Sequence, residues 1–300
     1  MNAIEIRSLS KSFRGMYAVD HLNMTVPQGA IYGFIGENGS GKSTTEKLIC
    51  GHLVADEGEI KLFGKSYTDP GVRTRVGALI ENAGCFPNSS VYQNLKMQAL
   101  NLNLKDPDGE IKRVLEIVRM EDSARIKFKS CSLGMKQRIG IAMALLGDPA
   151  LLILDEPING LDADGMRIMR EILVDITQKY GCTVLISSHL LAELEKIATH
   201  YGIIRQGKMI AELSAKDMEK RAKVFVSLKT KDTNGALNIL KKEFNNVRLE
   251  GEYLRVYDEE STEKIVEFLL KNGHIVSEIH KNKVGLEEYY IELMSKKEEN

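Results

Sequence analysis

The sequence predicts an α/β fold with a parallel core, an antiparallel β subdomain and a helical subdomain, followed by a small C-terminal α+β domain. Three observations support this prediction. An apolar strand candidate at residues 30–35 leads through a glycine-rich turn into a helical pattern. A second strand candidate, within "PALLILDEP" at 149–157, is continuously apolar, as expected for a strand buried on both faces. Residues 222–300 alternate strand and helix patterns in the order β-α-β-β-α-β.

Composition narrows the class of protein. A chain of 300 residues is longer than one domain with a single hydrophobic core usually is, so a large domain and a smaller one are expected. The 41 Lys and Arg residues balance 42 Asp and Glu residues, which gives no broad positive surface for nucleic acid. The 4 cysteines lack the spacing of a metal or redox motif. No run of about 18 apolar residues occurs, so we expect a soluble chain in the cytoplasm.

The first strands lie on either side of the glycine-rich turn. Residues 1–30 and 59–80 read as short strands that alternate apolar and polar residues, with turns at glycines. This pattern predicts an antiparallel sheet attached to the parallel core.

The glycine-rich turn itself follows the strand candidate at 30–35. Residues 36–51, "GENGSGKSTTEKLICG", contain the spacing G-x-x-x-x-G-K-S directly before a helical run. In such a turn, backbone N–H groups and the positive end of a helix converge on an anion, and glycine allows φ > 0 and close approach. The lysine can reach the β and γ phosphates, and the serine hydroxyl can bind Mg²⁺. The sequence therefore predicts a P-loop NTPase core whose nucleotide site is formed by Gly36, Glu37, Asn38, Gly39, Ser40, Gly41, Lys42, Ser43 and Thr44.

A helical subdomain is predicted at residues 90–147, which are mostly helical in pattern. Ile111, Leu115 and Val118 recur on one helical face. Ser132 then begins a second helical pattern that stops before Pro149, so its N-terminus is exposed in the same way as that of the helix after the glycine turn.

A metal-bound nucleotide requires a carboxylate opposite the phosphate loop. Asp155 and Glu156 end the apolar run in "PALLILDEP". In P-loop enzymes the first acid of such a pair holds Mg²⁺, and the second can orient and deprotonate the water that attacks the γ phosphate. We therefore predict Ser43 and Asp155 as metal ligands and Glu156 as a catalytic base.

The segment before this acid pair resembles the signature of ATP-binding cassette (ABC) ATPases, usually L-S-G-G-Q. Here it reads C-S-L-G-M from Cys131 to Met135. Ser132 and Gly134 match the signature, whereas Met135 replaces the glutamine, so the usual contact of that glutamine side chain is not available. The order of phosphate loop, signature and acid pair extends the resemblance over residues 1–215, the predicted nucleotide-binding domain. Residues 222–300 are then a separate accessory domain.

The resemblance implies further site residues, with ATP and Mg²⁺ as cofactors. Phe13 matches the aromatic residue that stacks on adenine, and Ser132 and Gly134 match nucleotide-binding positions of the signature. His189, after the apolar strand "TVLISS", resembles the switch histidine that contacts the γ phosphate. Asn159–Asp162 resembles the D-loop. Glu81 occupies the position at which the family normally has glutamine.

Glu81 points to a subfamily. A carboxylate at this position can bind Mg²⁺ or the attacking water, but it adds negative charge beside ATP and cannot donate as an amide does. Together with the following "NAGCFPNSSVYQNL", it is similar to the ATPases of bacitracin and lantibiotic self-protection exporters. The resemblance implies export of antimicrobial peptides, with Glu81 as a nucleotide-binding and metal-binding residue.

The resemblance also implies partners. Two copies would pair head to tail, each ATP lying between the phosphate loop of one copy and the Ser132 helix of the other. A separate membrane permease would hold the chain at the inner face of the cell membrane, docked near the Glu81 loop and the helical subdomain.

Four alternatives remain open. Within transporters, the substrate could be another drug-like or lipid-like molecule. An ABC ATPase acting on DNA would need a long coiled coil between Thr44 and Ser132, and no heptad run occurs there. A ribosome-associated ABC protein would carry a second phosphate loop after residue 50, and none follows. The fourth alternative is a P-loop enzyme outside transport, such as a kinase. Such an enzyme would not need a signature helix, so residues 131–138 distinguish it from an ABC ATPase.

Overall fold

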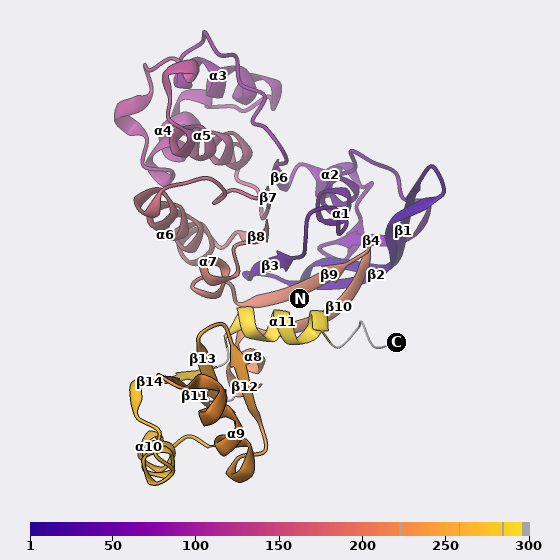
Figure 1. The fold of residues 1–300 in the computed structure, drawn as a ribbon. Coiled ribbons are helices and arrows are strands. Elements are labelled where there is room, and N and C mark those ends of the chain that lie inside the picture. The colour runs from indigo at the N-terminus through magenta and orange to yellow at the C-terminus, as the bar shows by residue number, and fades with distance from the viewer. Residues whose placement is uncertain (222–223, 258, 284, 296–300) are drawn as a thin grey trace. The chain divides into compact units, whose positions relative to one another are not determined.

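The chain divides into two compact units, Met1–Ala215 and Lys216–Asn300. The computed structural model describes residues 1–221, 224–257, 259–283 and 285–295, and Figure 1 shows their helices and strands. Within these ranges, no helix combines the length and the apolar composition needed to cross a bilayer.

The larger unit is built on a mostly parallel sheet, as the sequence predicts. Its strand order in the described residues is β10-β9-β3-β8-β7-β6, and only the edge strand β10 runs antiparallel to its neighbour. The strands are β3 (Ile31–Ile35), β6 (Val76–Leu79), β7 (Leu151–Asp155), β8 (Thr183–Ser188), β9 (His200–Arg205) and β10 (Lys208–Ser214). Every residue of β3 and β8 is buried, because both faces of the central strands are covered. The apolar runs in the sequence therefore identified the centre of this sheet.

A second, antiparallel sheet belongs to the same unit. Its order is β2-β1-β4-β5. The strands are β1 (Asn2–Phe13), β2 (Met16–Pro27), β4 (Glu57–Leu62) and β5 (Lys65–Ser66). Apolar side chains from both sheets, such as Leu9, Leu22 and Phe34, share one buried core.

One predicted strand lies in the other sheet. The strand pattern predicts that all of residues 59–80 belong to the antiparallel sheet, but β6 pairs in parallel with β7, with Val76 opposite Leu151. A short helix, α2 (Pro70–Arg73), separates β5 from β6 and starts at an Asp69 cap. The prediction was wrong for these residues because a four-residue apolar run does not reveal which neighbour it pairs with.

Helices cover the parallel sheet and form the helical subdomain (Figure 1). The helices that cover the parallel sheet are α1 (Lys42–Ile49), α6 (Ala163–Tyr180) and α7 (Leu191–Glu195). The helical subdomain consists of α3 (Val91–Asn101), α4 (Pro107–Ile117) and α5 (Leu133–Leu145), with short 3-10 turns at Glu121–Ser123 and Phe128–Ser130. Ser90 caps α3 in a capping box with Gln93, and Ser132 caps α5. The helix starts therefore follow local capping chemistry.

The smaller unit has the predicted order of strands and helices. Its described elements are α8 (Ala215–Arg221), β11 (Val224–Thr230), α9 (Thr233–Glu243), β12 (Val247–Glu250), β13 (Tyr253–Val256), α10 (Thr262–Lys271), β14 (Val276–Lys283) and α11 (Leu286–Ser295). The antiparallel sheet has the order β12-β13-β11-β14, a split β-α-β arrangement. Val226, Leu228 and Leu254 pack with Leu240 and Leu269 of the helices in a core of this unit's own residues.

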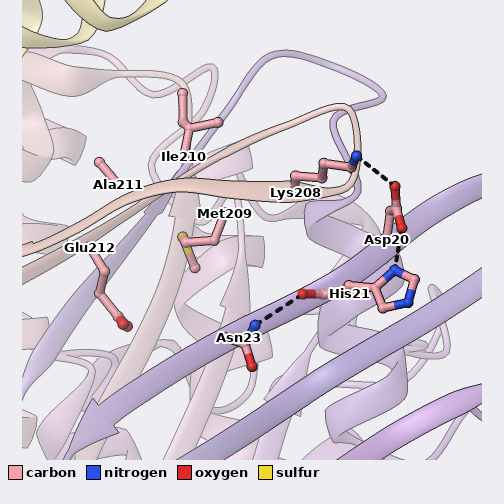
Figure 2. Close-up of a pocket in the computed structure, with 8 residues that line it drawn as sticks. All are labelled: Asp20, His21, Asn23, Lys208, Met209, Ile210, Ala211 and Glu212. Carbon is pink, nitrogen blue, oxygen red and sulfur yellow. Dashed lines mark hydrogen bonds and ion pairs between the residues drawn. The ribbon is translucent and has the colours of Figure 1, made fainter.

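The edges of the two sheets of the larger unit face each other across an open groove. Figure 2 shows the groove between β2 and β10, with Asp20 bridging His21 and Lys208. Glu212 of β10 accepts hydrogen bonds from the Tyr32 hydroxyl, at 2.6 Å, and from the Thr25 backbone, at 2.8 Å. These contacts tie the antiparallel sheet to the parallel sheet that carries the candidate site.

The close approach of α5 to β6 requires Gly77. A Cβ at Gly77 would lie 2.0 Å from the Ala144 carbonyl oxygen, a backbone atom that cannot rotate away. Gly77→Ala should therefore lower the free energy of unfolding by about 1–3 kcal/mol, the range for overpacking. Urea unfolding of the whole chain measures the change.

Gly71→Ala in α2 is the matched control. Its added Cβ would meet only a side-chain oxygen, Asp69 Oδ1, at 3.2 Å, so a change within about 1 kcal/mol is expected. Equal unfolding midpoints for the two variants would contradict the close approach.

Candidate nucleotide-binding site

The glycine-rich loop between β3 and α1 is packed against neighbouring backbone. Gly39 and Gly41 have φ of 78° and 110°, in the left-handed region that favours glycine. A Cβ at Gly41 would lie 2.4 Å from the Ala18 carbonyl oxygen, and one at Gly36 would lie 2.5 Å from that of Ile204. The loop can hold this shape only because side chains are absent at these positions.

A hollow opens beside this loop. Its lining consists of Ala18, Asn38, Gly39, Gly41, Lys42, Ser43, Thr44, Asp155 and Glu156. The predicted loop residues Gly36, Glu37 and Ser40 are not among them, and the Ser40 side chain is buried. The hollow therefore brings the phosphate loop and the acid pair together, as the sequence predicts.

Lys42 folds back over the loop. Its Nζ donates hydrogen bonds to the backbone oxygens of Gly36, at 2.6 Å, and Glu37, at 3.1 Å. The side chain is 6% exposed, yet it still lines the hollow. The ammonium group is thus held at the start of α1, where the helix dipole also favours an anion.

Asp155 lies between two hydroxyl groups at the end of β7. Ser43 Oγ donates to Asp155 Oδ2 at 3.2 Å, and Ser187 Oγ donates to Asp155 Oδ1 at 2.8 Å. Strand β8 lies between β3 and β7, which places Ser187 opposite Asp155 in the parallel register. The carboxylate is thereby fixed with one edge toward the loop residue Ser43.

Glu156 is the next residue, and it faces His189. The Glu156 carboxylate lies 2.9 Å from His189 Nδ1, which suits a ring nitrogen that donates to the acid. Its backbone N–H contacts the Ser187 carbonyl and hydroxyl oxygens, each at 3.2 Å. Glu156 has φ of 50°, in the left-handed region. This turn separates the two acids, so Asp155 points to Ser43 while Glu156 points to His189.

Glu81 is placed differently from the other acids. Its carboxylate forms an ion pair with Lys47 Nζ at 2.6 Å, and this ammonium group lowers the pKa of Glu81 below its usual value. Its backbone is also left-handed, with φ of 66°. Glu81 does not line the hollow that contains Asp155.

Among the described residues, no cluster of three or more His, Cys, Asp or Glu side chains could hold a metal ion.

The signature residues line a separate hollow of the same unit. Ser132 and Gly134 lie there with Gly160, Leu161 and Asp162 of the predicted D-loop. Ser132 Oγ accepts a hydrogen bond from the Met135 N–H at 3.3 Å and so caps α5. The helix terminus is therefore formed in this chain, but the phosphate loop and the signature do not meet within one copy.

Phe13 ends β1 and is 45% exposed. Lys11 Nζ lies 5.6 Å from the ring centre. The ring is outside the lining of the hollow at the loop, and its surface is accessible to a planar ligand.

Three residues of this region were not identified from the sequence. Ser187 holds Asp155, Lys47 pairs with Glu81, and Glu46 is fully buried beneath the loop. A lysine or serine in a strand or helix carries no pattern of its own. Glu46 did carry a signal, because an acidic residue is unusual in the part of a helix that faces the core.

Comparison with known proteins identifies the family. The family model described as ABC transporter matches residues 19–159. The bacitracin transport ATP-binding protein BcrA of Bacillus licheniformis is 35% identical, over 97% of each chain. The lantibiotic transport ATP-binding protein SrtF of Streptococcus pyogenes is 36% identical, over 74% of this chain and 95% of that protein.

A solved structure supports the fold. It is a dimeric post-hydrolysis state of the ATP-binding cassette MJ0796 bound to ADP and Pi, with a TM-score of 0.64, 20% identity, and coverage of 71% of this chain and 98% of that one. The P-loop, the helical subdomain and the signature helix of this chain are those of the same ATPase fold. The chain belongs to the ATP-binding proteins of ABC transporters and is an ABC transporter ATPase.

Proposed function

We propose that this ATPase powers a separate membrane permease that exports antimicrobial peptides of the bacitracin or lantibiotic type. One observation carries the proposal: the 35% identity to the bacitracin transport protein extends over 97% of both chains, so it includes the C-terminal domain as well as the ATPase core. The lantibiotic transport relative matches over 74% of this chain.

The hollow at the loop suits a nucleoside triphosphate with Mg²⁺. Loop N–H groups, the α1 terminus and Lys42 present positive charge to the phosphates. Ser43 Oγ and Asp155 Oδ2, 3.2 Å apart, are oxygen ligands of the kind that Mg²⁺ takes, together with phosphates and waters rather than a complete protein cage. When bound, the ion neutralises charge on the β and γ phosphates. Phe13 stacks on the adenine ring.

Glu156 and His189 are the hydrolytic pair in this proposal. Glu156 takes a proton from the water that attacks the γ phosphate, and His189, 2.9 Å away, orients the Glu156 carboxylate and contacts the γ phosphate. The left-handed turn at Glu156 keeps this carboxylate apart from Asp155. Glu81 would serve as a ligand of the ion or orient the attacking water only after its carboxylate separates from Lys47.

Two copies form the complete site. Ser132 and Gly134 line a different hollow from the phosphate loop, so a second chain brings its signature helix to the γ phosphate. Loss of the γ phosphate on hydrolysis removes the group that both copies bind, and the copies separate.

The permease docks on the helical subdomain beside the Glu81 loop. Phe86, which follows this loop, is 59% exposed, and Tyr92 on α3 is 38% exposed. Apolar side chains at such a surface suit a helix from a membrane partner. This docking places the chain at the cytoplasmic face of the membrane, and no contact with nucleic acid is proposed.

A different substrate is the second candidate. Many ABC ATPases share this site, because the cargo contacts the permease rather than the ATPase, so a drug-like or lipid-like substrate fits the same chain. Membership of the ABC transporter family weighs against action on DNA or the ribosome.

Glu156→Gln should keep ATP binding while turnover falls by about 10² to 10⁴, because the amide cannot accept the proton from water. Phosphate release and equilibrium binding of a fluorescent ATP analogue measure the two properties. Turnover equal to the wild type would remove Glu156 from this role.

Mixed subunits test the composite site. Ser132→Arg and Lys42→Ala each inactivate a pure dimer, whereas a mixed dimer retains one intact site and should recover up to about half of the wild-type activity per mixed dimer. Phosphate release by equimolar mixtures measures this. Mixtures as inactive as both pure variants would argue against the shared site.

Bacitracin and lantibiotic sensitivity tests the substrate. Cells that express the wild-type chain with its permease should survive higher peptide concentrations than cells expressing Glu156→Gln, because export needs turnover. Minimum inhibitory concentrations measure the difference. Equal sensitivity to both peptides, with a difference for a lipophilic drug, would favour the second candidate.

A further inference from the structure

Glu46 on α1 is buried next to the residues of the nucleotide site and does not line the hollow itself. Its side chain is 0% exposed, and neither carboxyl oxygen has a hydrogen-bond partner among the described residues. An unpaired carboxylate in such a place is costly, so buried acids are either paired or neutral. No step of the proposed hydrolysis uses Glu46.

The charges around Glu46 favour its neutral form. Asp155 and Glu156 at the end of β7 are like charges, and Lys42 on its own helix directs Nζ to the loop carbonyls instead. Burial first, and the Asp155 carboxylate second, raise the pKa of Glu46 well above its usual value. A raised pKa favours the carboxylic acid, which has one O–H donor.

The Ser187 hydroxyl is the neighbour that this donor can use. Ser187 is near enough for its hydroxyl to lower the pKa of Glu46, against the larger effect of burial. In the structure, however, Ser187 Oγ donates its hydrogen to Asp155 Oδ1 at 2.8 Å. Ser187 Oγ also accepts from the Glu156 N–H at 3.2 Å. A hydroxyl oxygen has two lone pairs, so one acceptor position remains, and the acid O–H of Glu46 can donate to it.

We infer that Glu46 is a positioning residue for the metal-binding acid: as a neutral acid it donates to Ser187 Oγ, which in turn donates to Asp155. This chain of hydrogen bonds supports Asp155 from the side opposite Ser43. Outer partners of this kind fix the orientation of a metal ligand, and their loss typically costs about 10- to 100-fold in metal affinity or activity. The inference rests on the proposed binding of Mg²⁺ by Asp155.

The test compares three single variants and the double variant Glu46→Leu/Ser187→Ala for the Mg²⁺ concentration that gives half-maximal ATPase activity. Glu46→Gln retains an N–H donor and should stay within about twofold of the wild type. Glu46→Leu keeps the apolar volume without a donor and should require about tenfold more Mg²⁺. Ser187→Ala should resemble Glu46→Leu, and the double variant should be no worse than the more affected single variant, because one chain is broken in each case.

Stability separates positioning from a structural role. Glu46→Leu removes one hydrogen bond but also removes a buried polar group, so the urea midpoint of the nucleotide-free protein should change little while metal affinity falls. Thr177→Val on α6 is the matched control, since Thr177 Oγ1 is also buried without a partner but lies outside both hollows. It should leave the Mg²⁺ requirement unchanged.

An infrared readout tests the neutral acid without nucleotide, metal or turnover. The wild type should show the carbonyl band of a protonated carboxylic acid at neutral pH, and Glu46→Gln should lack it. Absence of this band, a wild-type Mg²⁺ requirement in Glu46→Leu, or a Glu46→Gln variant as impaired as Glu46→Leu would each overturn the inference. If the band is present and the ATPase activity of the wild type needs no Mg²⁺, the proposed function fails rather than the protonation of Glu46.

Discussion

The parallel order of β3, β8 and β7 is the constraint on which the rest of the nucleotide site depends. The three strands run parallel, and β8 lies between the other two. The phosphate loop that follows β3 and the acid pair at the end of β7 therefore lie at the same edge of the sheet. Ser187, near the end of β8, fills the gap and holds Asp155 toward Ser43. Every other feature of the hollow, including the direction of Lys42 and the separation of the two acids, is arranged around this edge.

Burial makes the geometry at this edge rigid. Residues of β3 and β8 are covered on both faces, so a shift of register would disrupt close packing on both sides and move Ser187 out of reach of Asp155. The glycines of the loop also restrict the geometry, since a Cβ at Gly36 or Gly41 would collide with backbone oxygens of neighbouring strands. The fold itself therefore fixes the shape of the site.

Much of this arrangement could be predicted because its signals are local. The glycine spacing, the apolar run before Asp155 and the Ser132 cap each lie within a few residues, and each identified its element. Long-range pairings carry no such signal: the short apolar run Val76–Leu79 did not show that it joins β7, and the sequence around Ser187 did not show that it faces Asp155. The placement of Glu81 beside Lys47 also depends on how two distant segments pack.

The backbone at Glu156 has a practical consequence. Glutamate disfavours the left-handed conformation that this residue adopts, with φ of 50°. Asparagine and glycine tolerate that conformation better, so selection of variants for heat resistance alone would favour these residues here and would return a more stable protein without the proposed catalytic carboxylate. Thermostability screens of this chain therefore need a phosphate-release assay beside them.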